Sequence, residues 1–163
     1  MNFFLDKYFW IVFILYSFYM VSAPKSLLAG WEKNDKIMDE YKALRKNILM
    51  FMNLPWLIMG IGIISGSVSS MFEYLLPAKG NPFITLFFIS AALLWAVSLY
   101  WVFMLNGAEK AARFQIFRFN SFGKRSELTP DSIKLTIVLM VLAGIFATIM
   151  IFTNNVSLTA FHR

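Results

Sequence analysis

The sequence of 163 residues contains no cysteine and a single histidine, His162. Without cysteine, the chain cannot form a disulfide, a thiolate zinc site, an iron–sulfur cluster or a thiol nucleophile. One histidine is too few for a metal or haem site held by two histidines of one chain. The sequence also lacks a phosphate-binding glycine loop, an HExxH zinc motif and a GxSxG serine motif. We therefore expect no cofactor, no metal site and no enzymatic activity.

Charged residues are also scarce. They make up 15% of the chain and hydrophobic residues 59%, whereas a soluble domain has about 25% charged and about 45–50% apolar residues. This composition predicts one integral membrane domain over residues 1–163, with the lipid bilayer as a partner. The net charge of +6 could suit nucleic acid, but a phosphate-binding face needs a soluble scaffold to display it. We therefore expect no nucleic-acid partner.

Four stretches have the length of a membrane-spanning helix, which needs about 20 mainly apolar residues. They cover about residues 8–28, 55–76, 82–105 and 132–153. Asn81 before Pro82 and Thr129 before Pro130 are typical of an N-cap followed by a first-turn proline. The first stretch is as short as the apolar part of a signal peptide, but its many aromatic residues favour a true span. The prediction is an all-α, polytopic membrane protein with four transmembrane helices.

The stretch between the first two spans, about residues 31–52, is polar, yet it has an apolar helical face. Spacings of i, i+4, i+7 and i+11 place four side chains on that face: Ile37, Tyr41, Leu44 and Ile48. This pattern predicts a cytoplasmic amphipathic helix whose face contacts the membrane surface or a partner protein. The alternative is a helical extension of the second span into water. Pro55 favours a break, with Asn53 near the start of the second span.

Basic residues are distributed unevenly between the two sides of these spans. Twelve of the fifteen Lys and Arg residues lie in or beside the two loops that follow the first and third spans. Lys7, Lys79 and Arg163 lie at the other face. Because cytoplasmic loops of membrane proteins are rich in Lys and Arg, we expect both basic loops in the cytoplasm and both termini outside. This orientation favours a bacterial inner membrane.

Small residues concentrate in the second, third and fourth spans. In lipid, small residues let helix backbones approach closely. We therefore predict a tight core of these three helices, with the first span outside it and the fourth packed against the second. The predicted helix-packing residues are Gly62, Gly66, Ala143, Gly144 and Ala147.

Polar residues inside the second span allow a different interpretation. If that span were helical throughout, Gly62, Gly66, Ser69 and Glu73 would share one face, with Ser65 and Ser70 beside it. Ser65, Ser69, Ser70 and Glu73 are then a candidate polar face that lines a pore or a ligand groove. Glu73 could instead pair with Lys79 across the turn that follows.

A second candidate polar site lies at the inner end of the third span. Asn106 and Glu109 could share it with Lys134, or the helix could simply leave the bilayer there. The function that fits all these features best is a non-catalytic small integral membrane subunit, an assembly partner of a larger membrane complex. It would bind other membrane subunits or copies of itself. The alternative is a homo-oligomeric ion channel or small-solute transporter.

Overall fold

The computed structural model describes residues 3–23, 25–31, 34–75, 80–117, 120–121, 124–125 and 128–153. The elements, in chain order, are α1 (Phe3–Met20), α2 (Lys25–Trp31), α3 (Asp35–Ile64), η1 (Met71–Leu75), α4 (Pro82–Met104), α5 (Gly107–Phe114), β1 (Asn120–Ser121), β2 (Lys124–Arg125) and α6 (Pro130–Thr153). The strands hold two residues each and pair antiparallel. Apart from this small hairpin the regular structure is helical, which confirms the predicted all-α fold.

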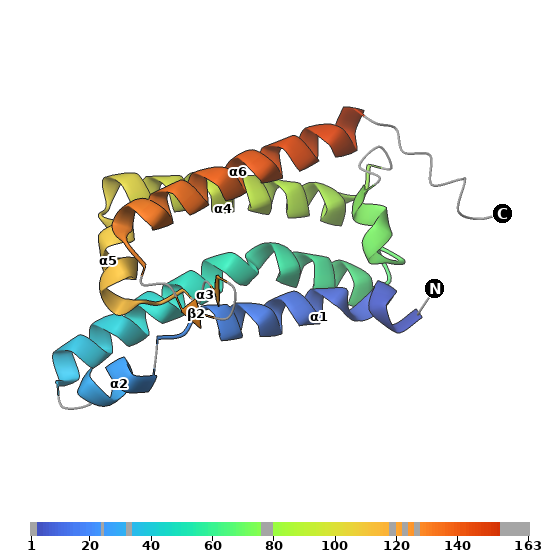
Figure 1. The fold of residues 1–163 in the computed structure, drawn as a ribbon. Coiled ribbons are helices and arrows are strands. Elements are labelled where there is room, and N and C mark those ends of the chain that lie inside the picture. The colour runs from blue at the N-terminus through green and yellow to red at the C-terminus, as the bar shows by residue number, and fades with distance from the viewer. Residues whose placement is uncertain are drawn as a thin grey trace.

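The four long helices, α1, α3, α4 and α6, run side by side and alternate in direction (Figure 1). In order of contact, α1 packs on α3, α3 on α4, and α4 on α6. The short helices α2 and α5 lie at one end of the molecule, where α3 begins and α4 ends, and η1 lies at the opposite end (Figure 1). We call these the α5 end and the η1 end. The expectation that the fourth span packs on the second is wrong, because α6 packs mainly on α4 and α5.

Three of the helices, α3, α4 and α6, are long and apolar enough to cross a membrane, as expected of an integral membrane protein. Four spans are not confirmed, because α1 is not among the helices of the described residues that are long and apolar enough to cross a membrane. The 18 residues of α1 include Asp6 and Lys7. The uncharged part that follows is about 20 Å long at about 1.5 Å per residue, which is shorter than the hydrocarbon core of about 30 Å.

The first helix ends at Met20 and does not continue to residue 28 as predicted. The residues that follow are extended and held by other parts of the chain. Val21 forms an isolated antiparallel bridge with Phe117, and the backbone N–H of Ala23 donates to the Tyr41 hydroxyl at 3.1 Å. A proline follows Ala23 in the sequence, which disfavours a helical backbone at Ala23 itself.

The second span and the amphipathic stretch before it form one helix, α3, of 30 residues. The predicted break at Pro55 is therefore wrong, and Asn53 lies within the helix and not at its start. Proline removes one backbone donor, but both parts of α3 have their own packing. The part before Pro55 packs against α2 and α5, and the part after it contacts α1, η1 and α4. Packing on both sides keeps the helix continuous through the proline.

The same helix ends at Ile64, so the predicted helical span over residues 55–76 is wrong in its second half. Gly66 adopts a left-handed conformation with φ of 73°, which helices commonly use to stop. Its N–H donates to the carbonyl of Ile63 at 3.1 Å, and the N–H of Val68 donates to that of Gly62 at 3.0 Å. Gly66 therefore terminates the helix, and a Cβ there would meet open space. It does not lie on a helix-packing face.

The larger hydrophobic core lies at the α5 end. Its buried residues come from α3, α4, α5, α6 and the segments beside them: Val21, Ala23, Tyr41, Leu49, Val102, Ala108, Ala111, Ala112, Phe114, Ile116, Leu128 and Ile133. Tyr41 lies against Trp31 and Phe114 at ring-centroid distances of 5.6 and 6.0 Å. Ile37, Leu44 and Ile48 are partly buried against the same core. The expectation that this face contacts lipid headgroups or another protein is thus wrong for Tyr41, because the chain covers it with α2 and α5.

Two ion pairs connect helices at the α5 end. Lys134 of α6 donates to the carboxylate of Glu109 on α5 at 2.9 Å, so the predicted proximity of these two residues is confirmed. This hydrogen bond lowers the pKa of Glu109 below its ordinary value. Arg113 of α5 reaches Glu40 of α3 at 3.4 Å. Asn106, also expected near Lys134, is exposed at the start of α5 with a φ of 53° and makes no side-chain cap.

The contact face of α6 differs from the predicted one. Gly144 lies against α4, where a Cβ would overlap the indole ring of Trp95. Ala143 and Ala147, which the sequence analysis also assigned to packing, are exposed. The buried residues of this helix, Ile133 and Val141, lie on the side of Gly144. The expectation for Ala143 and Ala147 is therefore wrong within this chain, and that for Gly144 agrees with its contact.

The conformation of Gly66 gives the first prediction. Gly66→Ala should lower the free energy of unfolding by about 1–2 kcal/mol, the cost of a left-handed conformation for an L residue. Gly66→Asn should cost less, because asparagine tolerates this region. The matched control is Gly30→Ala in α2, where a Cβ also meets open space. Unfolding of the three variants in detergent is the measurement, and equal costs for Ala and Asn would contradict the helix-terminating role.

The neighbouring small residues of α6 give the second prediction. Gly144→Leu should destabilise the purified chain by about 1–3 kcal/mol, the usual cost of overpacking, because Trp95 occupies the space a side chain needs. Ala143→Leu should leave the midpoint of thermal unfolding nearly unchanged, since Ala143 is exposed. Loss of stability in the Ala143 variant but not in the Gly144 variant would show that α6 is rotated from the position described.

Candidate functional site

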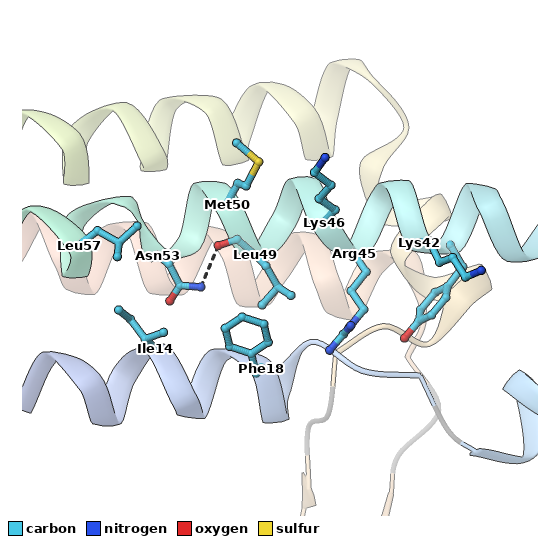
Figure 2. A pocket seen from close by; sticks show the side chains of 10 residues that line it. Ile14, Phe18, Lys42, Arg45, Lys46, Leu49, Met50, Asn53 and Leu57 are labelled. Atoms are coloured by element: carbon cyan, nitrogen blue, oxygen red, sulfur yellow. Dashed lines mark hydrogen bonds between the residues drawn. The ribbon is translucent and has the colours of Figure 1, made fainter.

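A groove lies between α1 and α3. Its volume is about 540 Å³. Two residues of α1 and eight of α3 line it: Ile14, Phe18, Tyr41, Lys42, Arg45, Lys46, Leu49, Met50, Asn53 and Leu57. The two helices run antiparallel here, so the last turns of α1 lie beside the middle of α3 (Figure 2).

A polar pair at the base of the groove joins the two helices. The side-chain amide of Asn53 donates to Ser17 Oγ and to the carbonyl of Leu49, each at 2.8 Å, and both side chains are buried. Ser17 Oγ lies 2.7 Å from the carbonyl of Ile14, to which it can donate. Hydrogen bonds of this kind stabilise helix pairs in lipid, where an unpaired polar group is costly. Asn53 and Ser17 therefore fix α1 against α3.

Further contacts along the same helix pair keep this register. On one side of the Ser17–Asn53 pair, the rings of Phe13 and Trp56 stack, with centroids 4.0 Å apart and an interplanar angle of 5°. On the other side, Arg45 Nε donates to the carbonyl of Val21 at 2.9 Å. Together with the Ala23–Tyr41 hydrogen bond, these contacts place successive residues of α1 opposite successive residues of α3 in antiparallel order.

Three cationic side chains, Lys42, Arg45 and Lys46, lie at the end of the groove where α1 terminates (Figure 2). Both lysines are exposed and Arg45 is half-buried. The described residues form two ion pairs, Arg113 with Glu40 and Lys134 with Glu109. None of the three cations of the groove takes part in either pair. This end of the groove therefore holds three positive charges without a neutralising partner among the described side chains.

The candidate polar face of the second span does not form a helical stripe. Ser65 and Ser69 are exposed residues of the turn and bend that follow α3, and Ser70 is the half-buried last residue of that bend. Ser65 Oγ lies 3.1 Å from the carbonyl of Gly62 and 3.0 Å from Ser67 Oγ. Glu73 lies in η1 and is half-buried, and its expected partner Lys79 lies outside the described residues. The expectation of one polar helix face is wrong, because α3 ends at Ile64, before all four residues.

Gly62 does lie at a close approach between segments. It is buried, and a Cβ there would be 2.5 Å from Tyr74 Oη and 3.1 Å from Phe83 Cβ. Its neighbours are therefore aromatic side chains of η1 and α4, so Gly62 lies at a close approach, as expected of a packing residue. Gly62 and Gly66, four residues apart, thus have different roles in the structure.

Sequence reasoning did not identify Asn53 and Arg45 as the residues that define the groove. One signal was present: Asn53 and Ser17 are isolated polar residues in otherwise apolar stretches, and in lipid such residues usually seek each other. Arg45 gave no comparable signal, because it lies among many charged residues of the amphipathic stretch. Its contact with Val21 depends on where α1 ends.

The polar pair between α1 and α3 gives the third prediction. Ser17→Ala and Asn53→Ala should each destabilise the helix pair, and the double variant should lose less than the sum of the two. A double-mutant cycle should give a coupling of about 0.6 kcal/mol, the average for hydrogen bonds between membrane helices. Unfolding of all four proteins in one detergent supplies the cycle, and strictly additive losses would count against the pair.

The sites described above supply no assembled metal centre. The part of the chain that the structure describes contains no group of three or more His, Cys, Asp or Glu residues that could hold a metal ion. Comparison with protein-family models, with curated proteins and with solved structures finds no match for this chain. Inference about function therefore depends on the geometry of these residues.

Proposed function

We propose that this chain is a non-catalytic integral membrane subunit that assembles with other membrane proteins through the exposed faces of α4 and α6. The observation that carries the proposal is the small part these two helices bury within the chain. Of the most apolar window of α6, 6% is buried, compared with 11% in α4 and 33% in α3. Most of the surface of α4 and α6 is thus available to lipid or to a partner.

The composition of those exposed faces supports a protein partner. Ala92 and Ala96 are exposed on α4, and Ala143 and Ala147 are exposed on α6. Small residues at helix interfaces in membranes allow the backbones to come close, and van der Waals packing drives association there. Two alanines one turn apart on each helix provide a surface of this kind, whereas contact with lipid alone does not require it.

We also propose an orientation for the assembly. Apart from Lys7 near the start of α1, the basic residues of the long helices and of α5 lie toward the α5 end, and the positive-inside rule places such an end in the cytoplasm. Helix α1 begins and α6 ends at the η1 end (Figure 1), which supports both termini lying outside. A bacterial inner membrane is the membrane that fits this orientation best.

The alternative of a channel or transporter receives no specific support from the geometry. Its motivation was a row of hydroxyl groups along the second span, ending at Glu73. That row is interrupted at Gly66, where α3 has already ended. We therefore keep assembly as the proposed function.

Photo-cross-linking in native membranes tests the proposal and gives the fourth prediction. Because the chain has no cysteine, a single Ala147→Cys substitution confines a benzophenone maleimide to one position of this chain, and the unsubstituted chain gives the background from other labelled proteins. Ala147 should cross-link to another membrane protein, and native mass in mild detergent should exceed that of one chain. A band of twice the chain mass would instead show that the partner is a second copy.

Leu142→Cys is the matched control. Leu142 is also exposed on α6, but it lies about 140° around the helix from Ala147. It should cross-link several-fold less. Equal cross-linking at both positions, or a native mass of one chain with no protein band at either, would refute assembly through this face.

A further inference from the structure

We infer that the groove between α1 and α3 binds a phospholipid with an anionic headgroup. The cationic end, Lys42, Arg45 and Lys46, would receive the phosphate, and the apolar part beyond it would receive an acyl chain. This inference does not depend on the proposed assembly, because the groove lies on α1 and α3 and the proposed docking faces lie on α4 and α6.

The side chains that line the groove change from cationic to apolar along its length. Along α3, from its cationic turns toward its C-terminal end, the cations come first, then Leu49 and Met50, and finally Asn53 and Leu57 (Figure 2). A ligand that matches this order has a charged group at one end and a hydrocarbon chain at the other. Arg45 and Leu57 are twelve residues apart on one helix, which corresponds to about 18 Å. This length is close to half of the hydrocarbon core, about 15 Å, which one lipid leaflet fills.

The cations of the groove keep hydrogen-bond donors available for an anion. Arg45 uses Nε to donate to the carbonyl of Val21 at 2.9 Å, which orients the guanidinium group. Arginine has five N–H donors in a planar fork that matches the geometry of phosphate, so four remain after the Val21 contact. Lys42 and Lys46 lie on either side of Arg45 in sequence and form no ion pair with a described carboxylate. Lys42, Arg45 and Lys46 all line one end of the groove, with Arg45 pointing toward the end of α1 (Figure 2), and basic residues gathered beside an apolar surface are typical of a site for an anionic headgroup.

The exposed apolar side chains of the groove favour a lipid over a soluble phosphate compound. Phe18, Met50 and Leu57 line the groove and remain 49%, 62% and 45% exposed. A soluble phosphate would leave these apolar side chains uncovered, whereas an acyl chain would cover them. The groove also lies on a helix long and apolar enough to cross a membrane. Lipid therefore reaches it directly from the bilayer.

The test, which is the fifth prediction, compares lipid binding by the intact chain and by Lys42→Gln/Lys46→Gln. Purified protein in detergent is titrated with palmitoyl-oleoyl phosphatidylglycerol or with the matching phosphatidylcholine, and bound lipid is counted by native mass spectrometry. The intact chain should retain phosphatidylglycerol in preference to phosphatidylcholine. Because each basic residue near the surface contributes about fivefold in affinity for anionic lipid, the double variant should lose about 20- to 30-fold.

The control variant removes the same charge elsewhere at the α5 end. Lys36 and Lys110 are exposed and do not line the groove, so Lys36→Gln/Lys110→Gln should retain phosphatidylglycerol like the intact chain. All four lysines are exposed, which allows both variants to fold. A second arm adds glycerol phosphate, which has the anionic group without a chain and should not displace the bound lipid.

Four outcomes of the lipid titrations would overturn the inference. They are equal retention by the groove variant and the intact chain, an equal loss in the control variant, equal retention of phosphatidylcholine, and displacement of phosphatidylglycerol by glycerol phosphate. The last would show a phosphate site without a lipid site. An acidic peptide found in the groove of the purified protein in place of lipid would likewise overturn it.

Discussion

Helix α3 is longer than the membrane is thick, and the rest of the fold accommodates the excess. Its 30 residues correspond to about 45 Å, whereas the hydrocarbon core of a bilayer measures about 30 Å. About 15 Å of the helix must therefore extend beyond the apolar layer on one side. The extension carries the charged residues of the chain between Asp35 and Lys46, and its apolar face, centred on Tyr41, requires a cover.

The cover comes from the short segments at the α5 end. Trp31 of α2 and Phe114 of α5 lie against Tyr41 at ring-centroid distances of 5.6 and 6.0 Å. The ion pair between Arg113 and Glu40 lies beside them, at 3.4 Å. Exposed ion pairs of this kind contribute little to stability, so burial of the aromatic rings is the main reason that this end holds together. The larger core of the protein therefore lies at the end of the helix row and not at its centre.

The groove follows from the same mismatch in length. Helix α1 ends at Met20, beside the middle of α3, because the Ser17–Asn53 and Phe13–Trp56 contacts fix the register of the two helices. Beyond that point α3 continues along its cationic turns without α1 beside it. An apolar surface shared by two helices thus passes directly into a charged surface on one helix, which gives the groove its change of polarity.

Several features of the fold were predictable from local sequence. Asn81 caps α4 as expected, accepting from the N–H of Phe83 at 2.9 Å, and Pro82 and Pro130 begin α4 and α6. Capping depends on a few adjacent residues, so the sequence contains the whole of the signal. The apolar length of these helices is equally local, and it indicated a membrane protein without any knowledge of contacts.

Other features depended on neighbours that are distant in the sequence. Pro55 was expected to break a helix, but packing on both sides keeps α3 continuous. Gly66 was assigned to a helix face, but it terminates the helix. Whether α3 continues past this point depends on the contacts that Gly62 makes with η1 and α4, which the local sequence does not contain. For the candidate site, the sequence indicated the polarity of residues 31–52 but not the groove, which exists only where α1 stops.

The amino-acid sequence by itself thus determined the helical class and the starts and apolar length of α4 and α6, because these depend on composition and on residues within one or two turns. The tertiary structure alone decided which side of each span is buried. Helices α4 and α6 are apolar all round, so no periodicity distinguishes the side that faces Trp95 and Gly144 from the side that carries Ala143 and Ala147. In lipid, the hydrophobic effect does not separate these sides either, and only the fit between neighbouring helices does.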